Sequence, residues 1–185
     1  MLSMFVNNQK KRRNKRLLGE LSDFPEGTMA IGRLDEHSEG LLFLTTDGMT
    51  SEEVRSKKVE KEYYVQVDGE ITASAVDALG SGVTINVKGE SYQTLKCPVR
   101  SIDPPDLPER AKKIRDERHG PTSWVSITLS EGKFRQVRKM TAAVGFPTLR
   151  LIRVRIGIIL LGDMKPEEVL EVDQLEVTRI YSSRG

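Results

Sequence analysis

The sequence predicts an α+β fold with a mixed, mostly antiparallel central sheet and flanking helices. Short β-rich runs separated by turn residues recur along the 185 residues. Segments with helical spacing lie between these runs, without a regular strand–helix–strand rhythm. The chain also lacks the Gly-x-Gly-x-x-Gly and Gly-Lys-Ser/Thr motifs, which counts against a doubly wound nucleotide-binding fold. A chain of this length suits one domain.

The expected strands combine alternating or β-rich sequence with a turn residue at one end. Residues 63–68 are the clearest case, since they alternate and Gly69 follows them. Residues 156–161 are the most apolar stretch, which a buried strand explains. By these criteria, strands are expected at residues 41–44, 63–68, 83–87, 92–99, 124–129, 149–154, 156–160 and 175–180.

Three segments carry helical signals. Thr50 and Glu53 have the spacing of a capping box, which predicts the start of a short helix. Residues 72–79 place apolar side chains at helical spacing, and a glycine-rich stretch ends that helix. Residues 134–144 show the same spacing, and a glycine followed by a proline ends them.

The remaining segments lack periodicity. Residues 1–25 contain a basic block at 10–16, so we expect a poorly structured arm or a truncated start before a single domain at 26–185. Residues 103–108 predict a long loop, because their prolines fix φ and lack an N–H donor. Residues 111–118 are charged on all sides, which favours an exposed helix or arm.

Composition narrows the class of protein. No apolar run approaches the ~18 residues that a membrane span needs. Cys97 is the only cysteine, so an internal disulfide and a cysteine-rich zinc site are excluded. His37 and His119 lie far apart and have no ligand-like neighbours. We therefore expect a cytoplasmic protein without a membrane span, a disulfide or a metal.

The charges are segregated, although the formal net charge is only +2. No acidic residue occurs between Glu131 and Asp163, whereas residues 167–176 are acidic. This pattern favours a polyanionic partner, and solvated surface patches are the alternative. The cations of the acid-free stretch are Lys133, Arg135, Arg138, Lys139, Arg150, Arg153 and Arg155.

The stretch from Gly32 to Gly48 carries the chemistry. In an extended segment Arg33 and Asp35 project to the same side, so a cation and a carboxylate can line one pocket. On local grounds alone, an ordinary surface ion pair before a turn is the favoured explanation. Asp35 and Glu39 also raise the possibility of a two-carboxylate glycosidase or nucleosidase.

The same stretch resembles a family signature. Gly32-Arg33-Leu34-Asp35, followed by Ser38, Gly40-Leu41-Leu42 and Asp47-Gly48, is similar to the first motif of the RsuA-type ribosomal RNA pseudouridine synthases. Residues 61–67 resemble the strand that carries the family's active-site tyrosine, and residues 131–140 resemble its third, basic motif. Residues 121–124 and 144–153 are most similar to the RluE-type branch, whose members act on large-subunit RNA.

The resemblance implies the pseudouridine synthase fold and the isomerisation of uridine to pseudouridine in 23S ribosomal RNA. The target base must leave the stack before the enzyme can reach it. Asp35 takes the essential catalytic role, acting on either the ribose or the base, and Tyr63 stacks on the uracil. Arg138 is the expected partner of the Asp35 carboxylate, with Arg135 as the second choice.

The resemblance also implies the RNA-binding residues. Arg33 would fill the gap that the flipped base leaves, because a planar guanidinium can stack. Arg135, Arg138 and Lys139 have i, i+3, i+4 spacing and would share one helical face. The other expected RNA-binding residues are Lys61, Lys133, Gln136, Arg150 and Arg153. The expected enzyme is a monomer that binds ribosomal RNA, without cofactor and without an S4 domain.

Two positions depart from the family pattern. Thr46 stands where asparagine is common, and Phe134 stands where a polar residue is common. Both bear on fine specificity more than on the chemistry. A catalytically silent RNA-binding or assembly factor remains an alternative, although the joint presence of Asp35, Tyr63 and Arg138 counts against it.

Overall fold

A computed structural model describes residues 5, 16–55, 59–108 and 119–172 of the chain. Its α-helices are α1 (Gly48–Arg55), α2 (Ala73–Ser81) and α3 (Gln136–Ala143), and a 3₁₀ helix spans Leu18–Glu20. Its strands are β1 (Met29–Ala30), β2 (Glu39–Gly40), β3 (Leu44–Thr45), β4 (Lys61–Asp68), β5 (Thr84–Val87), β6 (Glu90–Gln93), β7 (Val99–Ile102), β8 (Thr122–Leu129), β9 (Thr148–Ile156) and β10 (Ile159–Leu160).

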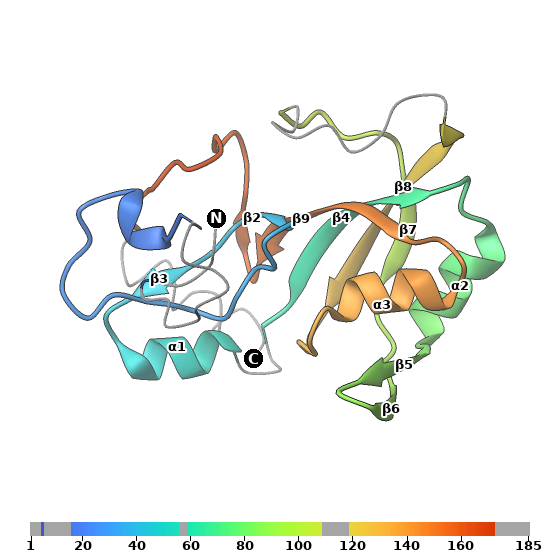
Figure 1. The fold of residues 1–185 in the computed structure, drawn as a ribbon, viewed down its shortest axis with the longest axis horizontal. Helices are drawn as coiled ribbons and strands as arrows, with labels where there is room; N and C mark the ends of the chain where they lie inside the picture. The colour runs from blue at the N-terminus through green and yellow to red at the C-terminus, as the bar shows by residue number, and fades with distance from the viewer. Residues whose placement is uncertain (1–4, 6–15, 56–58, 109–118, 173–185) are drawn as a thin grey trace.

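The central sheet has the strand order β10-β9-β4-β8-β7, and β2 pairs with β9 from outside this path. β2 runs parallel to β9, whereas the β10–β9, β9–β4, β4–β8 and β8–β7 pairs are antiparallel. Two small antiparallel sheets, β1–β3 and β5–β6, flank it. The α+β prediction with a mixed, mostly antiparallel sheet is confirmed (Figure 1).

The main core lies between the sheet and the helices α2 and α3. Alternation along β4 points Val65 and Val67 to this side, where they are fully buried. Leu79 of α2 and Val137 and Met140 of α3 pack against them, and Figure 1 shows both helices on the same side of the sheet. Each fully buried aliphatic side chain contributes ~1.5–3 kcal/mol, so this layer fixes α3 firmly on the sheet.

A second core connects the Asp35 segment to the end of the sheet. Ile31 and Leu41 flank that segment in sequence, and both are buried with Val54 of α1 and Ile156 of β9. The segment is therefore anchored at both ends by apolar packing.

The expected strand at 41–44 is wrong as a single element. Residues 41–43 instead connect β2 to β3, which begins at Leu44, and Leu41 donates its N–H to the Arg153 carbonyl oxygen at 2.9 Å. Gly40 makes this pairing possible: it has φ +98°, and a β-carbon there would lie 2.2 Å from the Arg153 oxygen. The chain thus bends onto β9 where the sequence alone reads as a continuous apolar run.

Other helix and strand boundaries differ from those predicted from the sequence. α1 begins at Gly48 rather than at Thr50, because the Asp47 carboxylate accepts hydrogen bonds from the Met49 and Thr50 N–H groups. Residues 92–99 do not form one strand, since β6 and β7 belong to different sheets. β9 is continuous through residue 156, and β10 folds back onto its end.

The ends of the chain were only partly predicted. Leu18 is buried within its 3₁₀ helix, so residues 16–25 are folded rather than part of a structureless arm. The basic block, the charged segment at 111–118 and the expected last strand at 175–180 fall outside the described residues, apart from Arg16. Within the described ranges, no helix has the length and apolar character to cross a membrane.

Candidate active site

Asp35 lies in extended, irregular chain between β1 and β2. Its carbonyl oxygen accepts the Ser38 N–H at 2.8 Å, which closes a short turn directly after it. Its carboxylate oxygen Oδ2 lies 3.6 Å from Nη1 of Arg135, and the two side chains are 26% and 41% exposed. The carboxylate is thus paired with a cation while remaining accessible from solvent.

Arg135, rather than Arg138, makes this ion pair, which corrects the first choice from sequence. α3 begins one residue later, at Gln136, and Arg135 precedes it with φ 52° and ψ 36°. Arg135 is therefore the N-cap of α3 and not part of the helical face that carries Arg138 and Lys139. The i, i+3, i+4 spacing predicted a common face because it placed Arg135 inside the helix.

Arg138 instead holds the turn that follows Asp35. Its Nη2 donates to the His37 carbonyl oxygen at 2.8 Å and lies 3.4 Å from the Ser38 hydroxyl. Its Nη1 lies 3.5 Å from the Thr148 carbonyl oxygen at the start of β9. Two arginines from the same segment thus act on the Asp35 loop, one on the carboxylate and one on the backbone.

Tyr63 lies on β4, opposite Arg153 of β9 and Ile127 of β8. It is partly buried and packs against the main core, on the side of α2 and α3. Tyr64 packs on the other side of the sheet with Trp124 and Ile152. The predicted separation of the two tyrosines is therefore confirmed, and Tyr63 shares its side of the sheet with the third motif.

Lys61 and Arg153 bring two cations together beside Tyr63. Burial, and to a smaller extent the positive charge of Arg153, lower the pKa of Lys61 to about 8. Arg153 is only 6% exposed and donates from Nε to the Leu41 carbonyl oxygen at 2.7 Å. Among the described residues, its Nη2 has no hydrogen-bond partner. Arg153 thus ties β9 to residue 41, and its expected role in holding a phosphate stays a prediction.

Arg150 and Glu39 engage each other. Arg150 Nε and Nη2 lie 3.1 and 2.8 Å from the two Glu39 carboxylate oxygens, and Nη2 also donates to the Pro108 carbonyl oxygen. The guanidinium is mostly buried, with 12% of its side chain exposed, so the expected role in phosphate binding is not supported. Both Glu39 carboxylate oxygens accept hydrogen bonds from Arg150, which argues against Glu39 as the second catalytic acid of a glycosidase.

Three comparisons with known proteins bear on this arrangement. Residues 3–143 match the RNA pseudouridylate synthase family. The chain belongs to this family. The matched residues include the Asp35 turn, β4 and all of α3, so the family match covers all three elements that meet at the site.

Individual relatives agree with the family match. The chain is 43% identical over 145 residues to a protein of Vibrio parahaemolyticus named ribosomal large subunit pseudouridine synthase E, covering 77% of this chain and 59% of that protein. A Xanthomonas axonopodis protein of the same name is 43% identical over 155 residues, covering 82% and 79% of the two chains. The chain therefore spans less than two thirds of the Vibrio relative.

The fold comparison gives the same family. A crystal structure of a pseudouridylate synthase superposes with a TM-score of 0.72 at 26% sequence identity, covering 89% of this chain and 65% of that one. The α+β pseudouridine synthase fold expected from the motifs is confirmed.

The turn before α3 contains buried polar contacts that the sequence did not predict. Gln136, expected to bind RNA, is only 3% exposed and bonds to Glu131 and to the Lys133 N–H. Glu131 is 6% exposed and also binds Tyr92, a residue 39 positions away. Sequence reasoning missed Glu131 and Tyr92, because an acid before a glycine reads as a solvated turn residue.

Several of the cations expected to bind RNA keep exposed surface among the described residues. Arg33 and Lys133 are exposed, and Lys139 is partly exposed. Lys133 Nζ lies 4.5 Å from the Tyr92 ring centroid, and Lys139 Nζ lies 5.2 Å from that of Phe134, which is 51% exposed. No group of three or more His, Cys, Asp or Glu side chains that could hold a metal ion occurs in the described ranges.

Proposed function

We propose that this protein isomerises a specific uridine to pseudouridine in large-subunit (23S) ribosomal RNA, with Asp35 as the essential carboxylate. The observation that carries the proposal is the pairing of the accessible Asp35 carboxylate with Arg135 at 3.6 Å, in a turn that Arg138 also holds. The names of the Vibrio and Xanthomonas relatives support the choice of RNA.

The reaction breaks the N1–C1′ bond of uridine, rotates the uracil and forms a C5–C1′ bond. The C5 proton is lost to solvent, N1 takes up a proton, and no other atom enters or leaves. Asp35 would act on the ribose or the base, with the Arg135 guanidinium beside its carboxylate. No metal or organic cofactor is needed to balance the step.

RNA would approach over the side of the sheet that carries Tyr63 and α3. The exposed cations Arg33 and Lys133 would meet phosphates or an unstacked base, together with Lys139. Tyr63 would stack on the flipped uracil, and the base must leave its helix first, at a cost of a few kcal/mol. In this proposal the enzyme works as a monomer in the cytoplasm.

Tritium release from RNA containing 5-tritiated uridine tests the proposal, because the label is lost when C5 bonds to C1′. Asp35→Asn should lower the rate of release at least ~100-fold while RNA affinity stays nearly unchanged, since the change removes a function and keeps the shape. Asp77→Asn, at an exposed position of α2, is the matched control and should behave like wild type.

Two results would overturn the assignment. Near-wild-type release from Asp35→Asn would remove Asp35 from the chemistry. Tight RNA binding by wild type with no tritium release would favour the silent RNA-binding factor instead. Pseudouridine mapping of ribosomal RNA from a deletion strain, with and without the restored gene, would then identify the modified uridine.

A further inference from the structure

Glu131 is a buried carboxylate that the proposed chemistry does not use. It lies in the turn between β8 and α3, with 6% of the residue exposed. Oε2 accepts the Tyr92 hydroxyl, and Oε1 accepts the Leu95 N–H at 3.0 Å and the Gln136 side-chain amide at 2.6 Å. Three donors from two separate parts of the chain therefore converge on one side chain.

These bonds determine the orientation of the Gln136 amide. With its nitrogen directed to Glu131, its oxygen accepts the Lys133 N–H at 2.9 Å, and the Gln136 N–H donates to the Lys133 carbonyl oxygen at 3.1 Å. Gln136 thus closes the turn with both its side chain and its backbone, and Arg135 lies inside that closed turn.

Arg135 needs such support. Its φ of 52° is in the left-handed region, which is unfavourable for a residue with a side chain and persists only where the surroundings enforce it. Lys139 donates its N–H to the Arg135 carbonyl oxygen at 3.1 Å from the first turn of α3. The unusual backbone conformation and the pairing of this side chain with Asp35 therefore occur at the same residue.

We propose that Glu131 is a positioning residue: through Gln136 it holds Arg135 in the left-handed conformation that brings the guanidinium to Asp35. Tyr92 orients the second carboxylate oxygen and extends this support to the β5–β6 hairpin. The inference rests on the proposed function, because it concerns the turnover that Asp35 and Arg135 support.

The variants Glu131→Gln and Glu131→Ala distinguish the hydrogen bonds of this side chain from the space that it fills. The oxygen of a glutamine can still accept from Leu95 and Gln136, and its amide can donate to the Tyr92 hydroxyl, whereas alanine removes all three bonds. Single-turnover tritium release should fall ~10–100-fold in Glu131→Ala and stay within ~3-fold of wild type in Glu131→Gln. RNA affinity should change little in either variant.

A double-mutant cycle distinguishes positioning from general stability. In an Arg135→Ala background, Glu131→Ala should add less than ~2-fold, because the residue that it positions is already gone. Full multiplication of the two losses would overturn the proposal, as would wild-type turnover per folded Glu131→Ala molecule.

Glu62→Ala provides the matched control. Glu62 is also a largely buried carboxylate with several donors, but it faces the other side of the sheet, so its loss should lower the melting temperature without lowering turnover. A crystal structure of Glu131→Ala gives a readout that does not require activity: the Arg135–Asp35 separation should exceed 3.6 Å, and an unchanged separation would contradict the inference. Absence of tritium release from wild type would instead overturn the proposed function. The Arg135–Asp35 separation in the crystal structure would still test the role of Glu131.

Discussion

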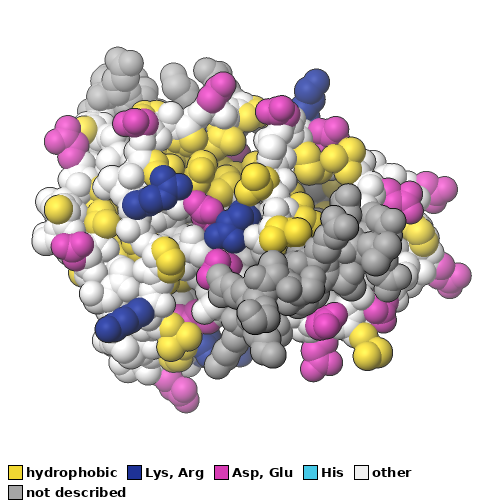
Figure 2. Space-filling view, turned by 180° about the vertical axis from the view of Figure 1, so that it is seen from behind, with side chains coloured by type: hydrophobic (Ala, Val, Ile, Leu, Met, Phe, Trp, Pro, Cys, Tyr) yellow, Lys and Arg dark blue, Asp and Glu magenta, His cyan; other side chains and the backbone are white. Residues whose placement is uncertain are grey.

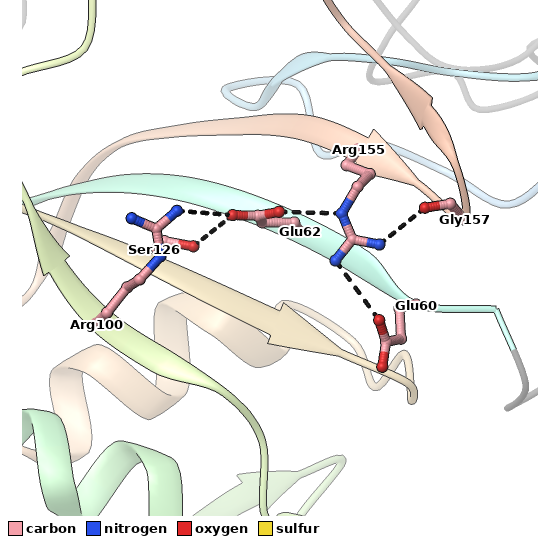
Figure 3. A network of polar contacts seen from close by, with 6 residues as sticks. All are labelled: Glu60, Glu62, Arg100, Ser126, Arg155 and Gly157. Atoms are coloured by element: carbon pink, nitrogen blue, oxygen red, sulfur yellow. Dashed lines mark hydrogen bonds and ion pairs between the residues drawn. The ribbon is translucent and has the colours of Figure 1, made fainter.

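Glu131 and Glu62 are both carboxylates that several donors surround, on opposite sides of one sheet. Glu131 binds neutral groups, namely a phenol, a backbone N–H and a side-chain amide. Glu62 binds Arg155 Nε at 3.0 Å and the Ser126 hydroxyl at 2.7 Å, with Arg100 Nη2 at 3.4 Å. Figure 3 shows the Glu62 network on the strands, with helices behind them.

The difference lies in what each network leaves for a ligand. Arg155 also pairs with Glu60 at 3.5 Å, so two arginines and two acids balance each other on the Glu62 side. Charged side chains of both signs lie next to each other near the centre of this face (Figure 2). The hollow of about 350 Å³ that Glu60, Glu62, Arg100 and Arg155 help to line is thus electrically balanced.

On the other side, the Glu131 carboxylate is satisfied mainly by neutral donors, while neighbouring cations stay exposed. Lys133 and Arg135 flank the buried network and face solvent. Neutral donors therefore secure the turn without pairing with the neighbouring cations that are proposed to bind RNA. The two buried carboxylates thus have similar numbers of hydrogen bonds but different donors. Arginines bind Glu62, whereas neutral groups bind Glu131 and leave the nearby cations exposed.

The largest expected effect separates two arginines with similar ion pairs. Arg135 and Arg100 lie 3.6 and 3.4 Å from their carboxylates, and their side chains are 41% and 63% exposed. Arg135→Ala should lower kcat about 100-fold, because it removes charge beside the reacting groups. Arg100→Ala should stay within a factor of about 2, as expected for an exposed pair. Tritium release measures both, and equal losses would break the comparison.

A smaller effect should follow the pH dependence of Lys61. Its pKa is lowered from 10.5 to about 8, so its charge is lost as pH rises through 8. If that charge helps to hold RNA, kcat/KM should fall by about tenfold per pH unit above 8, and Lys61→Arg should abolish this limb because arginine stays protonated. A flat profile between pH 7 and 9, or the same limb in Lys61→Arg, would contradict this role.

The same shift predicts an opposite trend in stability. Between pH 8 and 10.5 the unfolded chain holds a proton on Lys61 that the folded protein has lost, so stability rises with pH across this window. Melting temperatures of wild type relative to Lys61→Met should therefore increase from pH 8 to 10.5. As pH rises, activity would thus fall while stability increases. This difference distinguishes a role of Lys61 in binding from a role in folding.

Periodicity predicted the elements whose burial is regular. β4 alternates between buried and partly buried residues in its second half, from Val65 to Asp68, and α2 begins after Thr72, whose hydroxyl accepts the Ala75 N–H as an N-cap. β8 alternates in sequence, although both of its faces are buried from Trp124 to Leu129. The roles proposed for Asp35 and Tyr63 came from family motifs, because spacing alone could not separate Tyr63 from Tyr64. Local pattern and resemblance together thus gave the fold and the elements of the site.

The features that the sequence did not predict depend on contacts between residues far apart in the chain. Arg153 is buried because β2 pairs with β9 beside it, and no local feature records that pairing. The tie between Tyr92 and Glu131 crosses 39 residues, and the left-handed conformation of Arg135 depends on it. At the site, the corrections concern charged or polar residues that locally read as exposed and that tertiary contacts bury or redirect.

The smallest effect on activity, and a clear one on stability, should come from Glu62→Gln. Burial raises the pKa of Glu62, but hydrogen bonds from Ser126 and Arg155 and the charges of Arg155 and Arg100 lower it below 4.5 overall. Its contribution is therefore present above pH 4.5 and lost as pH falls through the folded-state value.

At pH 7, Glu62→Gln should reduce the free energy of unfolding by ~1–3 kcal/mol, because it leaves two guanidinium groups without their shared anion. Urea unfolding at neutral pH and again below pH 4.5 measures this loss, which should shrink in acid as the wild-type carboxylate becomes neutral too. Glu131→Gln should lose less at neutral pH, since its donors are mainly neutral. A pH-independent loss in Glu62→Gln, or a larger one in Glu131→Gln, would show that donor charge does not distinguish the two sides.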